Sequence, residues 1–195
     1  MKKTQKVHPL TAPFTRAQIS PLRVGDRVRL SGRIFTGRDR FHKYLFDGGK
    51  PPVSLRDAAI YHCGPVVVRK AGRWVVTAAG PTTSIREEPY TPAIMARYGL
   101  RVMIGKGGMG AGTRAACRRQ GGIYIQVIGG AAALLAAKIK KVEAVHFLKE
   151  FGQAEAVWVF DVDGLEGVVT MDAAGRDDHA AVRERSRRAL QKLLK

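Results

Sequence analysis

The feature that most constrains the fold is a glycine-rich loop between a strand-like and a helix-like segment in the middle of the chain. An apolar run at 102–104 leads into a loop at 105–112 with five glycines, then a helix-like segment at 113–120 and a second apolar run at 123–128. Strands and helices in such an order bury their apolar sides against each other in layers. Other strand-like runs follow one another without a helix between them. The sequence therefore predicts an α/β fold with a mixed, layered sheet rather than a purely parallel one.

The other segments complete this outline. Residues 27–35 alternate basic or small residues with apolar ones, which is typical of a half-buried strand. Asp39 is a suitable N-cap for the short helix that follows, and Asp47-Gly48-Gly49 would end that helix. Further strands are predicted at 59–63, 66–68, 74–77, 157–160 and 167–171, and helices at 40–46, 92–98, 131–141 and 178–194.

Three regions are expected along the chain. Residues 1–24 contain three prolines and several basic residues, which predicts an extended basic N-terminal arm. Residues 25–175 hold nearly all the periodic apolar segments and form the predicted folded domain. Residues 176–195 are polar and basic, which predicts a basic C-terminal helix or tail.

The charge balance narrows the partners. The chain has 34 Lys and Arg against 16 Asp and Glu, a formal charge of +18, which attracts polyanions. An acidic partner subunit, small dianionic substrates and nucleic acid all fit that charge. The basic residues gather in the first forty-three residues and in the tail, and no aromatic residues are interleaved with them as in proteins that stack single-stranded bases. We therefore do not expect nucleic acid as the partner.

Several classes of protein are not expected. No apolar run reaches the roughly eighteen residues needed to cross a membrane. The basic start of the chain leads into no apolar signal segment. Cys63 and Cys117 cannot build a disulfide framework and suit a reducing cytoplasm. Two distant cysteines are also too few for an iron–sulfur cluster, which needs about three or four thiolates, so no metal or cofactor is expected on this chain itself.

The glycine loop allows three interpretations. Gly105-Lys106-Gly107-Gly108-Met109-Gly110 spells the G-x-G-x-x-G pattern of dinucleotide-binding folds. The acidic residue that should bind ribose about twenty residues later is absent, because the strand there reads Tyr124-Ile125-Gln126-Val127. Lys106 with backbone amides and a helix N-terminus could hold a carboxylate instead. The glycines could also serve only a tight turn.

Two further loops combine anion-binding and proton-transferring residue types. Residues 81–90 contain three adjacent hydroxyls, from Thr82 onward, and Arg86, whose planar fork suits a carboxylate; a helix N-cap is the alternative role. Arg38 and His42 flank Asp39 at a predicted strand-to-helix corner. An arginine that holds an anion and a histidine that moves protons near neutral pH make a plausible site, and a capping Asp39 with a surface histidine fits the spacing equally well.

Taken together, these loops resemble the signature blocks of class I fumarate hydratases. The resemblance is to the beta-subunit, or C-terminal, half of that family and to the related L-tartrate dehydratases, and it runs from about Gly25 to Asp172. The blocks are Thr36-Gly37-Arg38-Asp39 with His42, Ala79-Gly80-Pro81-Thr82-Thr83-Ser84-Ile85-Arg86 and Ile104-Gly105-Lys106-Gly107-Gly108-Met109-Gly110, supported by His62-Cys63-Gly64-Pro65, Val145-His146-Phe147 and Leu165-Glu166-Gly167.

The resemblance implies a function as well as a fold. It implies a swivelling β/β/α domain that closes over an active site shared with an alpha subunit, and that partner carries a [4Fe–4S] cluster. The substrate residues of the family correspond to Arg38, Thr82, Arg86 and Lys106, with His42 a further candidate beside Thr82 and Lys106 for catalysis. The implied reaction is the hydration of fumarate to malate, or dehydration of a close hydroxy-dicarboxylate such as tartrate, in a hetero-oligomer in which this subunit also pairs with its own copy. A basic nucleotide-binding or nucleic-acid-binding α/β module is the alternative function.

Overall fold

A computed structural model describes residues 6–194 of the chain, and its centre is a closed barrel of five strands. The barrel strands are β2 (Arg27–Thr36), β3 (Ala59–Tyr61), β6 (Val102–Gly105), β7 (Ile123–Gln126) and β9 (Val157–Met171). The first four run parallel in the order β2-β3-β6-β7, and β9 closes the ring by pairing antiparallel with both β7 and β2. The predicted mixed α/β fold is therefore confirmed, and its sheet is closed into a barrel.

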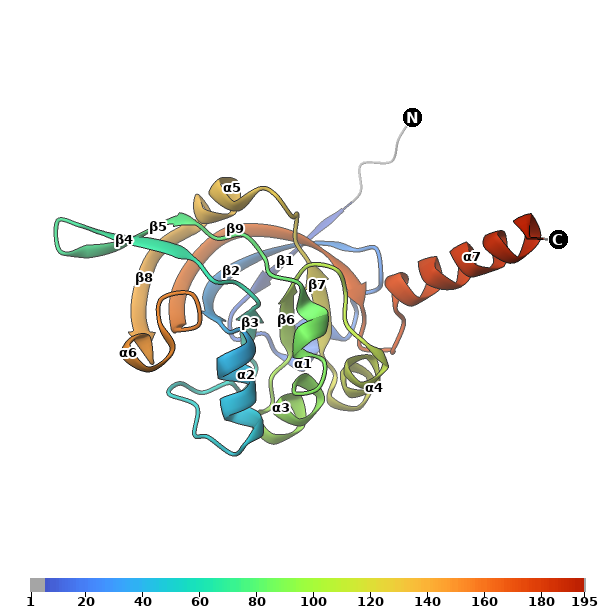
Figure 1. The fold of residues 1–195 in the computed structure, drawn as a ribbon, viewed down its shortest axis with the longest axis horizontal. Coiled ribbons are helices and arrows are strands. Elements are labelled where there is room, and N and C mark those ends of the chain that lie inside the picture. Colours follow the sequence, from blue (N-terminus) through green and yellow to red (C-terminus); the bar gives the residue numbers. More distant parts are fainter. Residues whose placement is uncertain (1–5, 195) are drawn as a thin grey trace.

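Two more strands extend the sheet outside the ring. β1 (Val7–Thr11) pairs parallel with the first half of β2, and β8 (Ile139–His146) pairs antiparallel with β9. A separate hairpin, β4 (Val66–Lys70) and β5 (Arg73–Ala78), projects from one end of the molecule in Figure 1.

Helices cover one side of the barrel. Figure 1 shows α2 (Asp39–Phe46), α3 (Thr91–Tyr98) and α4 (Ala111–Gln120) side by side below it. The last helix, α7 (Asp178–Leu193), extends away from the body and has no buried residue. Four short helical segments lie in the connections: α1 (Arg16–Ile19), η1 (Ser84–Glu87), α5 (Ala132–Ala136) and α6 (Leu148–Phe151).

Alternate residues of the short parallel strands face two different apolar clusters. In β6, Val102 and Ile104 belong to a first cluster, the barrel cluster, which holds no residue of α2, α3 or α4, so they point away from these helices and into the barrel. Met103, between them, belongs to a second cluster that includes Ile94 and Met95 of α3. Because both faces of these strands are buried, their sequences are continuously apolar rather than alternating.

The segment after β7 differs from the sequence prediction. A single helix was predicted at 131–141, but the structure has only α5 there, followed by β8. The pairing of β8 with β9, for example Val142 opposite Phe160, determines this outcome. Such a long-range pairing leaves no periodic signal in the local sequence, and alanine-rich segments have high helix propensity.

The two strands predicted at 157–160 and 167–171 are one fifteen-residue strand, β9. The charged residues between the two apolar runs do not interrupt the pairing with β2. Asp161 lies opposite Arg33 and Glu166 lies opposite Arg29, whereas Asp163 lies opposite Ser31. Glu166 forms ion pairs with Arg27 at 3.0 Å and Arg29 at 2.8 Å.

The predicted N-terminal arm is extended, but it belongs to the packed body from Val7 onward. Leu10 of β1 and Phe14 after it are at most 2% exposed and lie in the barrel cluster. The boundary predicted at residue 24 is therefore not a boundary in the packing; residues 1–5 lie outside the described part. Among residues 6–194, no helix is long and apolar enough to cross a membrane.

Candidate functional site

The predicted site residues lie on loops at the carboxyl ends of the parallel strands. Arg38 follows β2 and Lys106 follows β6 directly. Thr82 lies next to the end of β3, because its backbone N–H donates to the carbonyl oxygen of His62 at 2.7 Å. The same loop pairs with the glycine loop through a parallel bridge between Thr83 and Lys106. Parallel strands direct their carboxyl ends to one edge of a sheet, which is where α/β folds place ligands.

Each arginine of the site is held by a carboxylate. Arg86 donates a hydrogen bond from Nη2 to Oδ2 of Asp39, which ties the 81–87 loop to the start of α2. Arg38 lies 3.3 Å from Glu155, from Nε to Oε1. The side chain of Arg86 remains 45% exposed. Each of these contacts uses one guanidinium nitrogen, so the other donors of each fork stay available for a ligand.

Asp39 does not cap α2, contrary to the sequence prediction. The helix begins at Asp39 itself, and Arg38 is in the N-cap position with no side-chain hydrogen bond. The carboxylate of Asp39 is directed to Arg86 instead. The side chain of Glu155, which is distant in sequence, accepts a hydrogen bond from the backbone N–H of Arg40 at 3.1 Å. It thereby satisfies one donor at the N-terminus of α2.

Lys106 and Thr82 are the site residues with unengaged side chains. Both are half-buried, and neither side chain forms a hydrogen bond or ion pair within the described residues. The stem of Lys106 runs past Gly129, after β7, where a Cβ would lie 3.6 Å from Cδ. An ammonium without a carboxylate partner at this edge favours an anionic ligand.

Glu88 occupies the amides that a dinucleotide phosphate would need. Its carboxylate accepts hydrogen bonds from the backbone N–H of Gly110 at 2.7 Å and of Thr113 at 3.0 Å. The Thr113 hydroxyl donates to it as well, at 2.6 Å. The ring of His179 also covers Gly108, where a Cβ would lie 2.5 Å from it. The N-terminus of α4 is thus satisfied by groups of the chain itself, which argues against a dinucleotide phosphate at this loop.

His42 is buried behind the site rather than exposed in it. Its side chain is 0% exposed; Nδ1 lies 2.9 Å from the carbonyl oxygen of Arg38 and 3.4 Å from Oε2 of Glu87, which is equally buried. Burial lowers the pKa of His42 to about 4 and raises the pKa of Glu87 to about 8. Both groups are therefore neutral near pH 7, and the sequence-based assignment of His42 as a group that touches substrate is not supported by its position.

A second set of buried polar side chains, His62, Ser84 and Tyr124, lies beside His42. The rings of His42 and His62 are 5.1 Å apart, and Nδ1 of His62 lies 2.9 Å from Oγ of Ser84. Tyr124, from β7, donates its hydroxyl to the same Oγ at 2.9 Å. Burial, and then the neighbouring His42, lowers the pKa of His62 well below its ordinary value. Burial raises the pKa of Tyr124 to about 12, although hydrogen bonds with Ser84 and the backbone of Gly108 oppose the shift.

The two cysteines are not suited to hold iron. Cys63 and Cys117 are both 0% exposed and belong to different apolar clusters. Burial raises the pKa of each thiol to about 12, and two cysteines in separate clusters do not form the shared set of three or four ligands that an iron–sulfur cluster requires.

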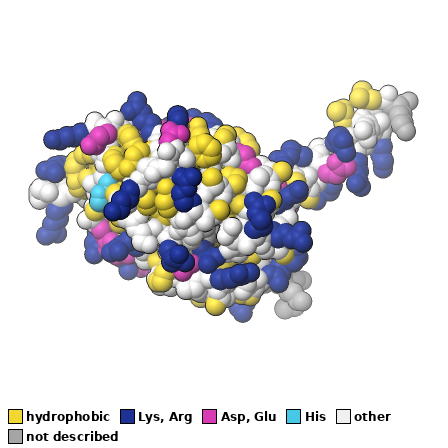
Figure 2. Space-filling view, turned by 90° about the horizontal axis from the view of Figure 1, so that it is seen from below, with side chains coloured by type: hydrophobic (Ala, Val, Ile, Leu, Met, Phe, Trp, Pro, Cys, Tyr) yellow, Lys and Arg dark blue, Asp and Glu magenta, His cyan; other side chains and the backbone are white. Residues whose placement is uncertain are grey.

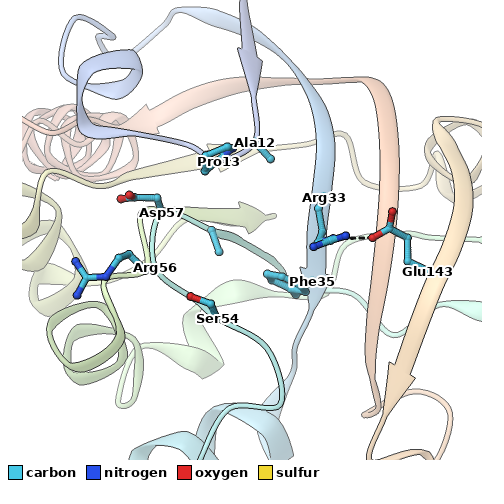
Figure 3. A pocket seen from close by; sticks show the side chains of 9 residues that line it. Ala12, Pro13, Arg33, Phe35, Ser54, Arg56, Asp57 and Glu143 are labelled. Atoms are coloured by element: carbon cyan, nitrogen blue, oxygen red, sulfur yellow. Dashed lines mark hydrogen bonds and ion pairs between the residues drawn. The ribbon is translucent and has the colours of Figure 1, made fainter.

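A distinct hollow of about 400 Å³ lies away from these loops. Figure 3 shows it between Ala12 and Pro13 on one side and the strand residue Phe35 on the other, with the ion pair of Arg33 and Glu143 at its rim. None of the predicted site residues lines it. The candidate site is instead a set of neighbouring loops at the carboxyl edge of the parallel strands.

The basic residues do not gather into one stripe on the face seen in Figure 2. Lys and Arg side chains there are spread among hydrophobic and neutral surface. On this face the surface has no basic stripe of the kind that nucleic-acid-binding domains commonly carry.

Comparison with known proteins identifies the family. A family model described as the fumarase C-terminus matches residues 1–182. The chain belongs to this fumarase C-terminal family. It is 50% identical over 183 residues to a putative class I fumarate hydratase from Geobacillus stearothermophilus, covering 93% of this chain and 35% of that relative. The chain thus spans about a third of the length of that protein.

Other relatives of the family are nearly as short as this chain. A putative L(+)-tartrate dehydratase subunit beta from Methanocaldococcus jannaschii is 34% identical over 93% of this chain and 95% of its own length. The L(+)-tartrate dehydratase subunit beta of Escherichia coli is 33% identical over 86% of this chain and 84% of its own length. The resemblance seen in the sequence motifs is confirmed at the level of the family, and these relatives are named as hydro-lyases or their beta subunits.

The structure joins the loops that carry all four residues expected to bind substrate, and it adds partners that the sequence did not indicate. Asp39 and Glu155 hold the arginines, and Glu88 caps the glycine loop. Glu155 lies more than a hundred residues from Arg38 in the chain, so no local sequence pattern predicts this ion pair. Ser84 lies in one of the signature blocks and Tyr124 in a predicted strand, but the sequence did not indicate that their side chains are hydrogen-bonded to each other.

Proposed function

We propose that this chain is the beta subunit of a two-subunit, iron–sulfur-dependent hydro-lyase that hydrates fumarate to L-malate or dehydrates a close hydroxy-dicarboxylate such as tartrate. The observation that carries the proposal is that the loops of Arg38, Thr82, Arg86 and Lys106 are joined to one another at one edge of the barrel. Membership of the fumarase C-terminal family supports it.

The side chains of this edge suit a dianion. Two guanidiniums and one ammonium can bind two carboxylates and fix the substrate between them, and Asp39 and Glu155 pre-orient the arginine forks. Ordered cationic groups also stabilise negative charge that develops on a carboxylate during the addition or removal of water. These residues would set the orientation of the substrate rather than break its C–O bond.

Thr82 is our candidate for proton transfer from this chain. Its hydroxyl is half-buried and forms no hydrogen bond within residues 6–194, so it is free to meet a substrate. A threonine hydroxyl has a high pKa and needs a neighbouring base to accept its proton. His42 is too deeply buried to serve as that base at the surface.

The cysteines of this chain do not fit an iron–sulfur cluster, so we place the cluster on the partner subunit, where it would supply a Lewis acid for the substrate hydroxyl or the attacking water. We propose that the barrel swivels to close its loop edge over that subunit. The high positive charge of the chain suits both an acidic partner surface and a dianionic substrate.

The proposal is tested by anaerobic co-production with a cluster-containing alpha subunit and assays of malate and tartrate dehydration. The complex should turn over one of these substrates, and this chain alone should show neither activity nor iron–sulfur absorbance. Activity of the chain alone, or a cluster-loaded complex that uses no hydroxy-dicarboxylate, would refute it.

A further inference from the structure

A buried trio of polar side chains joins the loops of the candidate site from beneath. Ser84, His62 and Tyr124 are each 0% exposed and come from η1, the end of β3 and β7. Oγ of Ser84 lies 2.9 Å from Nδ1 of His62 and accepts the Tyr124 hydroxyl at 2.9 Å. With a neutral His62, one arrangement makes both hydrogen bonds: Tyr124 donates to Ser84, and Ser84 donates to Nδ1, while Nε2 of His62 has no partner among the described residues.

Ser84 is the point at which two substrate loops meet. Its backbone N–H donates to the carbonyl oxygen of Lys106 at 3.0 Å, and Arg86 follows it two residues later. Gly105 leaves room for this junction, because a Cβ there would overlap Oγ of Ser84. The Tyr124 hydroxyl lies beside the glycine loop as well, because a Cβ on Gly105 would be 3.2 Å from it.

We propose that Ser84 is a positioning residue that, through His62 and Tyr124, sets the distance between Arg86 and Lys106. The inference rests on the proposed function, because these two side chains are the cations assigned to the substrate carboxylates. Fixing the cations at the spacing of two carboxylates selects a short dicarboxylate of one length. None of the three side chains touches the substrate.

The trio is poorly explained as simple packing. Three buried polar groups cost desolvation free energy that apolar residues of similar size would avoid, and here every hydrogen bond joins a segment of the site. Tyr98 offers a matched comparison: its hydroxyl donates to carbonyl oxygens of Leu45 and Gly49, away from the site loops. Removing either tyrosine hydroxyl deletes one oxygen atom, but only Tyr124 is connected to Ser84.

The first experiment uses the full chain alone and needs no activity. Hydrogen exchange of the backbone amides is compared between the parent, Tyr124→Phe, Ser84→Ala and the control Tyr98→Phe. We expect amide exchange in both the 82–87 and 105–109 segments to accelerate about tenfold or more in the first two variants. Exchange in β2 should stay unchanged, and the control should match the parent in both segments. Unchanged exchange in either segment of Tyr124→Phe overturns the inference.

The second experiment uses the complex with the alpha subunit. Loss of correct spacing should raise KM for the dicarboxylate by about tenfold in Tyr124→Phe, because two cations no longer meet two carboxylates together. A purely structural role would lower the active fraction and therefore kcat while leaving KM unchanged, and that result overturns the inference. If the parent complex turns over neither malate nor tartrate, the proposed function fails, whereas the exchange experiment still decides whether the trio holds the two loops.

Discussion

The buried Glu87 gives a prediction about stability that can be worked through from its surroundings. Burial raises its pKa to about 8, the negative charge of Asp39 acts in the same direction, and Arg86 opposes the shift. The folded chain therefore keeps a proton on Glu87 that the unfolded chain releases above about pH 4.5. The stability that this group contributes is complete below that pH and is lost as the pH rises toward 8.

His42 acts in the opposite sense. Burial lowers its pKa to about 4 from 6.5, so its contribution is lost as the pH falls from 6.5 toward 4. Between about pH 4.5 and 6.5 the two groups change the free energy of unfolding in opposite directions by the same amount per pH unit, so their effects cancel. From pH 6.5 to 8 only Glu87 changes it. At about 1.36 kcal/mol per pH unit for one proton, the Glu87 contribution to the free energy of unfolding falls by about 2 kcal/mol over that last interval.

Urea denaturation followed by circular dichroism at pH 6.5 and pH 8 measures this loss. In Glu87→Gln the side chain cannot ionise, so the variant does not lose this contribution. Its free energy of unfolding relative to that of the parent should therefore rise by about 2 kcal/mol from pH 6.5 to pH 8. Glu150→Gln, at an exposed position, is the control and should follow the parent. If the difference between Glu87→Gln and the parent does not change with pH, Glu87 is not held protonated and the reasoning is wrong.

Three further predictions concern the loops. Arg86→Lys keeps the charge but loses the planar fork, and should reduce kcat/KM of the complex by about tenfold or more, or about 1.4 kcal/mol; wild-type kinetics would remove Arg86 from the site. Lys106→Met should abolish most turnover with little change in the urea midpoint, and calorimetry should detect no binding of NAD; micromolar NAD affinity would contradict the assignment of the loop. Gly105→Ala should destabilise the chain by about 1–3 kcal/mol, because the new Cβ overlaps Ser84, whereas Gly129→Ala, with its nearest atom 3.6 Å away, should cost less; equal urea midpoints would contradict this.

Much of the fold was predictable because its signals are local. The apolar runs that became β3, β6 and β7 are continuous, since both of their faces are buried. The failures fall where distant pairing outweighs local preference, as in β8, whose position depends on β9.

The candidate site also has features that the sequence predicts and features that depend on tertiary packing. Arg38, Thr82, Arg86 and Lys106 could be selected from motifs, because the anion-binding residue types stand in recognisable loops. The burial of His42 could not be predicted, because a sequence does not show which face of a short helix will pack against the body. Its full burial beside Glu87 is a result of packing.

By itself, the sequence determined the α/β class, the family and the cationic residues of the candidate site, since each depends on residue type and short-range order. Only the tertiary structure decided that β9 closes the sheet into a barrel, that Glu88 satisfies the N-terminus of α4, and that Ser84 joins two loops from beneath. These features depend on contacts between residues far apart in the chain. Burial then changes the pKa of groups such as Glu87, and no local pattern encodes how deeply a side chain is buried.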